Sequence, residues 1–66
     1  MAFTLNLYSN GKFCKLEYGL ETVEDAEQFM RDEVQRMPDY YTVATITRFG
    51  APVKTINLEN INNEPQ

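Results

Sequence analysis

The chain has no histidine and no tryptophan, and its only cysteine is Cys14. Without histidine there is no imidazole to act as a base or as a metal ligand. A single cysteine cannot form an intramolecular disulfide, and without histidine it has no partner for a cysteine–histidine pair. These absences exclude several enzyme classes. We expect Cys14 to be a small, partly buried apolar residue of a strand, because a reactive thiol would need an electropositive setting that the sequence does not show.

Long apolar runs are also missing. No segment approaches the roughly 18–20 apolar residues that a membrane-spanning helix needs. The first residues, MAFTLNLYSNGK, do not have the basic and apolar blocks of a signal peptide. We therefore expect a soluble, cytoplasmic protein.

The composition is that of a small globular domain. The chain has 66 residues, of which 42% are apolar and 24% charged, so it can build one hydrophobic core with little stability to spare. Ten acidic residues against six basic ones give a net charge of −4. This charge opposes direct binding to nucleic acid and favours a basic partner.

The strongest local pattern is an alternation of apolar and polar residues over 3–8, followed closely by Asn10-Gly11. Asn-Gly favours a type I′ hairpin turn, because both central residues of that turn need positive φ. The register that this turn sets pairs Tyr8 with Phe13. The same register places six residues on the face towards the core: Phe3, Leu5, Leu7, Cys14, Leu16 and Tyr18.

A helix is predicted next, after a strand that ends at Gly19. Thr22 and Asp25 have the form of a capping box, so the helix should run from Val23 to Met37. The residues that should face the sheet are Val23, Ala26, Phe29, Met30, Val34 and Met37. Glu33 falls in the same arc, where its carboxylate either reaches solvent from the margin or meets a Lys, Arg or Tyr hydroxyl in a half-buried pair. Two ion pairs are predicted along the helix, Glu27 with Arg31 and Asp32 with Arg36.

A β-branched run over 42–48 and a segment from Val53 to about Glu59 predict a second hairpin around the turn 49–52. Two registers are possible. If Arg48 pairs with Val53, the residues towards the helix are Val43, Thr45, Ile56 and Leu58. A slip by one residue places Ala44 and Ile46 there, with Ile56 and Leu58, but opposes Arg48 to Lys54. We favour the first register, because it avoids facing two positive charges.

These elements predict a single α+β domain of order ββαββ over residues 1–61, followed by a disordered tail over 62–66. The sheet should be four-stranded and antiparallel or mixed, with the amphipathic helix packed on one face. Two strand orders fit. One is 2-1-4-3, as in ubiquitin-like (β-grasp) domains, with the first and last strands parallel, and the other places strand 2 beside strand 3.

The sequence shows no spacing typical of a catalytic or cofactor site. The three glycines are isolated, and no calcium-binding loop is present. The carboxylates are best explained as a solvated helix face, because an acid/base pair needs two of them in a pocket. We therefore expect no catalytic residue, no cofactor and no metal, and a small enzyme that uses carboxylates or Cys14 is the least favoured alternative.

Two surfaces are candidates for binding. The first is the outer face of the sheet, with Tyr8, Phe13 and Val53 as an exposed apolar patch. The second is the acidic face of the helix, formed by Glu24, Asp25, Glu27 and Asp32. Each has the alternative explanation of an ordinary solvated face.

The sequence therefore favours a small acidic protein-binding module without catalytic activity. Such a module would be a regulator, adaptor or inhibitor of a larger protein, which could be basic and handle nucleic acid. Small phage-encoded inhibitors have a comparable build, an analogy of size and architecture alone. The alternative is a structural subunit of a larger assembly. A homodimer is compatible with both, whereas direct binding to nucleic acid or to a membrane is not expected.

Overall fold

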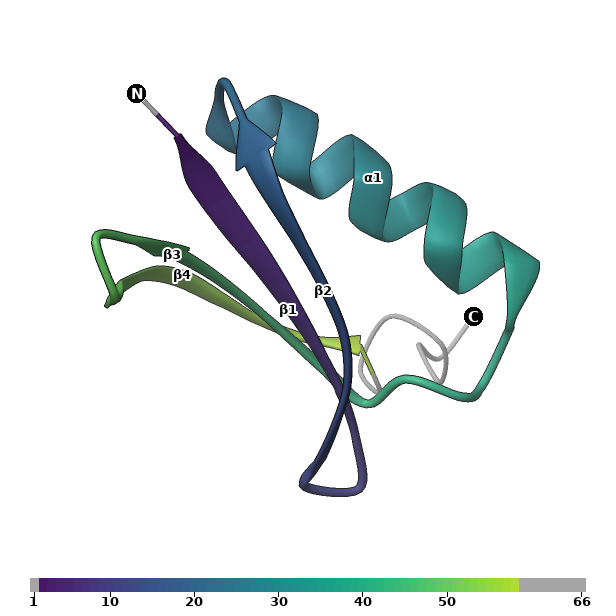
Figure 1. Cartoon of the computed structure of the whole chain (residues 1–66). Helices are drawn as coiled ribbons and strands as arrows, with labels where there is room; N and C mark the ends of the chain where they lie inside the picture. Colours follow the sequence, from purple (N-terminus) through teal and green to yellow (C-terminus); the bar gives the residue numbers. More distant parts are fainter. Residues whose placement is uncertain (1, 59–66) are drawn as a thin grey trace.

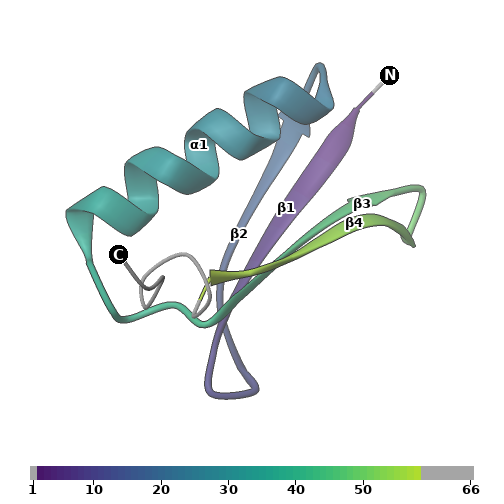
Figure 2. The ribbon, with the colours of Figure 1, turned by 180° about the vertical axis from the view of Figure 1, so that it is seen from behind.

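The computed structural model describes residues 2–58. The elements are β1 (Phe3–Ser9), β2 (Lys12–Leu20), α1 (Val23–Arg36), β3 (Val43–Arg48) and β4 (Ala51–Asn57). They form one antiparallel sheet of order β2-β1-β3-β4, with α1 across one face (Figure 1). The view from behind shows the same two layers (Figure 2). The predicted α+β class and ββαββ order are confirmed, and the predicted tail lies outside the described residues.

Neither predicted strand order is correct, because β3 pairs with the free edge of β1. The 14 residues of α1 span about 21 Å, roughly the length of six strand residues. The helix therefore returns the chain to the end of the sheet at which β2 began. From there β3 runs parallel to β2 with β1 between them, and all neighbouring strands are antiparallel.

The first hairpin turns at Asn10-Gly11, as predicted. Both residues have positive φ, 53° and 80°, as a type I′ turn requires. Beside the turn, Tyr8 lies opposite Phe13, which is also as predicted.

A β-bulge then shifts the register of β2 by one residue. Leu7 lies opposite Lys15, so Cys14 is the extra residue between two regular pairs. Opposite residues share a face, and a slip of one residue exchanges the two faces. The prediction that Leu16 and Tyr18 face the core is therefore wrong. Cys14 is partly buried against the core, as expected.

The helix begins at its predicted cap, since the Thr22 hydroxyl accepts a hydrogen bond from the backbone N–H of Asp25 at 3.0 Å. It ends at Arg36, with Met37 as its C-cap, one residue earlier than predicted. The strand before it also differs slightly, because it continues past Gly19 to Leu20.

The second hairpin is tighter than predicted. Phe49 and Gly50 form a two-residue turn with φ of 54° and 78°, and Arg48 lies opposite Ala51. A bulge at Val53 follows, so that Ile46 faces Lys54.

The register favoured from the sequence is therefore wrong. Ala44 and Ile46 are the residues of β3 that lie towards α1, and both are fully buried. The alternative register correctly places these two residues inward. Its disadvantage is that it opposes Arg48 to Lys54, and the bulge at Val53 removes this clash.

The core lies between α1 and the sheet. Its buried residues are Leu5, Leu7, Ala26, Met30, Tyr41, Ala44, Ile46 and Leu58. The rest of the predicted helix stripe, Val23, Phe29, Val34 and Met37, packs partly buried against them.

Candidate functional site

The two faces of the sheet differ sharply in character. Along β1, Leu5 and Leu7 are buried towards α1, so the residues that alternate with them, Thr4, Asn6 and Tyr8, point to the opposite side. Strand pairing extends this outer face across the sheet to Phe13, Leu16, Val43, Thr45, Thr47, Pro52, Thr55 and Asn57. Tyr18, two residues beyond Leu16 in β2 and exposed, lies on the same face. Among the described elements, α1 covers only the other face (Figures 1 and 2).

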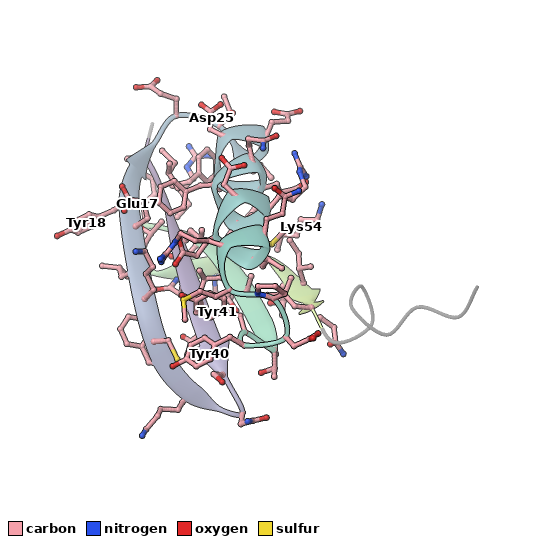
Figure 3. All side chains as sticks on the ribbon, turned by 90° about the vertical axis from the view of Figure 1, so that its right-hand side faces the viewer. Glu17, Tyr18, Asp25, Tyr40, Tyr41 and Lys54 are labelled. Atoms are coloured by element: carbon pink, nitrogen blue, oxygen red, sulfur yellow. The ribbon has the colours of Figure 1, made fainter. Side chains whose placement is uncertain are left out.

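Every charged residue of the four described strands is on the side of α1. These residues are Lys12, Lys15, Glu17, Arg48 and Lys54, which lie opposite Ser9, Leu7, Leu5, Ala51 and Ile46. Two of them pair with helix carboxylates. The Nζ of Lys15 lies 3.8 Å from Oε2 of Glu33, and the ammonium of Lys54, seen beside α1 in Figure 3, donates to Glu27. The outer face consequently carries no charged residue within the described strands.

Three exposed apolar side chains form a row on the outer face, along β2. Phe13 is 53% exposed, Leu16 41% and Tyr18 65%. Tyr18 projects from β2 away from α1 (Figure 3). The ring of Phe13 also packs edge-on against Tyr8, with centroids 5.8 Å apart. Such a row is the kind of apolar surface that small proteins use for association.

Both edges of the sheet are protected against pairing with another strand. The edge strand β2 carries the bulge at Cys14 and the inward-pointing Lys15. The edge strand β4 contains Pro52, the bulge at Val53 and the inward-pointing Lys54. Prolines, bulges and inward charges are features that discourage edge-to-edge association. Within residues 2–58, the outer face is therefore the surface of the sheet that neither α1 nor protected edges keep from a partner.

Glu33 resolves the alternative left open by the sequence, because its buried carboxylate is paired. The hydroxyl of Tyr41 donates to Oε2 at 2.9 Å, and the guanidinium of Arg36 donates to both carboxylate oxygens. Lys15 approaches from β2. The predicted pair of Asp32 with Arg36 is accordingly wrong, since Arg36 binds Glu33.

The pKa shifts in this cluster favour a structural role. The hydrogen bond from Arg36 lowers the pKa of Glu33, although burial acts in the opposite direction. Burial, followed by the hydrogen bond to Glu33, raises the pKa of Tyr41 to about 12. A catalytic acid or base works best with a pKa near the working pH, whereas both of these groups are shifted away from neutrality. The hydrogen bond between Glu33 and Tyr41 joins the last turns of α1 to the segment before β3, and Figure 3 shows Tyr41 at that end of the helix.

The acidic helix face is less available than the sequence suggested. Glu27 is partly buried and forms ion pairs with Lys54 and Arg31. The pair with Arg31 is as predicted, with 3.9 Å between a guanidinium nitrogen and Oε1 of Glu27. The carboxylate of Asp32 accepts a hydrogen bond from Gln28 at 2.9 Å. Glu24 and Asp25 are exposed in the first turn of α1, where acidic side chains stabilise the positive end of the helix dipole.

Val53, the third residue predicted for the outer face, lies at the bulge of β4 without an opposite residue and is 49% exposed. It is thus separated from the apolar row by the width of the sheet. Cys14, at the other bulge, donates weakly to the carbonyl of Lys12 at 3.3 Å and contacts the hydroxyl of Tyr40 at 3.9 Å.

The prediction missed Leu16 and Tyr18 as surface residues, although a signal was present. An acidic residue inside the apolar arc of a helix needs a partner on the sheet that it packs against. Lys15 can serve Glu33 only if it points inward, and this orientation turns its neighbour Leu16 outward.

Within residues 2–58, no group of three or more Cys, Asp or Glu side chains is arranged to hold a metal ion. No helix in that range is long and apolar enough to cross a membrane. No protein-family model, curated protein or solved structure matches this chain.

Proposed function

We propose that the chain is a small, non-catalytic protein-interaction module whose contact surface is the outer face of the sheet. The observation that carries this proposal is the separation of charge. In a chain with 24% charged residues, all charged residues of the described strands lie towards α1. The opposite face presents Phe13, Leu16 and Tyr18 to solvent. Depletion of charge and enrichment in aromatic residues distinguish the centres of protein interfaces from the rest of a protein surface.

The acidic helix face is the weaker candidate for the same role. Ion pairing to Lys54 and Arg31 already offsets the charge of Glu27. The exposed acids of the first turn have a structural explanation in the helix dipole. The apolar row of the outer face has one described ring contact of its own, between Tyr8 and Phe13, and the hydrogen bond from Asn6 to the carbonyl of Thr45 lies within the same face.

The module would act as a regulator, adaptor or inhibitor by occupying the surface of a protein partner, or it would serve as a subunit of an assembly. Both roles need the same kind of surface. Small size supports both, because a domain with one small core gains stability from a partner.

The proposal is tested by retention of protein partners on the immobilised full chain, with Leu16→Glu as the test variant. Gln35→Glu is the matched control, because it adds the same charge at an exposed position of α1. We expect the wild type and the control to retain the same partner and Leu16→Glu to lose it. Retention should change little between low and high salt, since the contact is apolar.

Retention that disappears at high salt, and on charge reversal of Glu24 and Asp25 instead of at Leu16, would assign binding to the acidic helix face. Equal retention by all variants would also contradict the proposal.

A further inference from the structure

We infer that the occupant of the outer face is a second copy of this chain, packed sheet against sheet about a two-fold axis. The inference rests on the proposed function, since it names the partner of the same surface. Two features of the structure lead to it, the distribution of charge and the protected edges, and the area of the face sets the strength of association that we expect.

The distribution of charge makes the outer face self-compatible. Two copies that each carry a net charge of −4 repel one another wherever their acidic surfaces meet. The outer face is the side of the sheet on which neither copy presents a charged strand residue. In an isologous interface each patch meets its own copy, so an uncharged patch needs no complementary charge opposite.

Face-to-face packing also keeps the acidic helices apart. Packed sheets lie about 10 Å apart, and each helix adds roughly another 10 Å on the far side of its own sheet. The two copies of α1 would therefore be separated by roughly 30 Å, several times the Debye length of about 8 Å at physiological ionic strength. Repulsion between Glu24 and Asp25 of the two copies is screened at this distance.

The protected edges disfavour the other common route to a β-sheet dimer, which is the pairing of edge strands. Pairing of β2 with a second β2 would meet the bulge at Cys14, and pairing of β4 would meet Pro52 and the bulge at Val53. The exposed row of Phe13, Leu16 and Tyr18 points out of the sheet, perpendicular to these edges. It is placed to be covered by a second layer, not by an additional strand.

The area of the face predicts a weak, reversible dimer. Four strands spaced by about 4.8 Å and about six residues long cover roughly 400 Å² per copy, or about 800 Å² for the pair. This total lies below the roughly 1,200 Å² at which stable interfaces begin. We therefore expect a dissociation constant in the micromolar range or weaker.

Sedimentation equilibrium of the full chain over micromolar to millimolar concentrations tests the inference. The wild type should pass from monomer to dimer as concentration rises. Leu16→Glu should weaken dimerisation at least about tenfold, because it buries an unpaired charge in the interface. Tyr18→Lys should weaken it in the same way although it makes the chain less acidic. Gln35→Glu, with the same net charge as Leu16→Glu, should dimerise like the wild type.

Each result has a definite meaning. If repulsion between acidic chains alone set the association, Tyr18→Lys would strengthen dimerisation, and this outcome would overturn the inference. A dimer that is indifferent to both outer-face variants would overturn it too. Tyr18 is 65% exposed, so Tyr18→Lys is expected to fold and remains informative even if Leu16→Glu does not.

A wild type that stays monomeric at all concentrations also overturns the inference. The proposed function survives that result if a different protein is still retained by the wild type and lost with Leu16→Glu, and it fails if nothing is retained. The failures of the two proposals can thus be distinguished.

Discussion

The hydrogen bond between Tyr41 and Glu33 gives a sharp test of how the helix is held to the sheet layer. Both residues are buried, and the phenol donates to the carboxylate at 2.9 Å. Tyr41→Phe removes this bond and a weak 3.9 Å contact of the hydroxyl with the sulfur of Met37. The carboxylate keeps its bonds to Arg36 and its contact with Lys15, so it is not left unpaired.

The expected loss of stability follows from the charge of the acceptor, the carboxylate of Glu33. A hydrogen bond to a charged group contributes about 1.5–3 kcal/mol to stability. In a domain of this size, 1 kcal/mol corresponds to about 4–8 °C in Tm. Tyr41→Phe should therefore lower Tm by roughly 6–24 °C, measured by thermal and urea unfolding followed by circular dichroism at neutral pH.

Tyr40→Phe is the matched control for this measurement. Its hydroxyl is exposed and, among residues 2–58, is hydrogen-bonded only to the sulfur of Cys14, at 3.9 Å, so its removal should cost less than about 0.5 kcal/mol. In a double-mutant cycle with Glu33→Gln, Tyr41→Phe should show a coupling of about 0.5–3 kcal/mol. Equal effects of the two tyrosine variants, or no coupling to Glu33, would refute the assigned role of the bond.

The cluster of Glu33 with Arg36, Tyr41 and Lys15 also predicts how the stability of the fold changes at acidic pH. The pKa of Glu33 is lower in the folded chain than its ordinary value of 4.5. The stability that ionised Glu33 contributes is therefore fully present above its ordinary pKa. It is lost as pH falls through the lowered pKa of the folded state. Glu33→Gln should remove this part of the acid dependence. An unchanged slope of stability against pH in the variant would contradict the pairing.

Other parts of the fold give predictions of the same kind. Gly11→Val should cost more than about 1 kcal/mol because Gly11 has φ of 80° in open space, so that backbone strain and not a clash sets the loss; a thermal melt unchanged by the substitution would contradict this. Phe49→Asn should raise stability by about 0.5–1 kcal/mol, since the strain relieved at φ of 54° exceeds what the exposed stacking of Arg48 on the Phe49 ring contributes, and a lower Tm would contradict this balance. Met30→Ala and Leu5→Ala should each cost about 2–5 kcal/mol, and wild-type urea midpoints in both would mean that α1 does not pack on β1. At alkaline pH the raised pKa of Tyr41 makes stability fall between 10 and about 12, a decline that Tyr41→Phe should lack in pH-dependent unfolding.

The class of the fold could be predicted from the sequence because its local signals agree with one another. Asn10-Gly11 specifies its turn, Thr22 and Asp25 specify the start of the helix, and the apolar period specifies the buried stripe of α1. Each of these signals depends on residues that are close together in the chain.

Register and strand order could not be predicted in the same way, since they depend on contacts between distant segments. The bulges at Cys14 and Val53 each insert one residue and so exchange the faces of the residues that follow, in β2 as far as a second irregularity between Glu17 and Leu20. Neither bulge carries a glycine that would mark it in the sequence. The bulge at Cys14 brings Lys15 inward beside Glu33, and these two residues are 18 positions apart in the chain.

The candidate site was found only in part for this reason. Tyr8 and Phe13 precede the first bulge, and they were placed on the correct face. Leu16 and Tyr18 follow it and were assigned to the core, although they contribute much of the exposed row. The acidic helix face can be predicted from the sequence, whereas the pairing of Glu27 with Lys54 depends on the fold, because it joins α1 to β4.

The most direct test of the outer face as the contact surface is a methyl NMR spectrum of the full chain recorded from micromolar to millimolar concentration. Methyl groups report on the face to which they point, and association changes their environment. The account predicts concentration-dependent shifts for Leu16, Thr45 and Thr55, with Val23 and Val34 of α1 unchanged. Shifts at Val23 and Val34 with the outer-face methyl groups unmoved would contradict it.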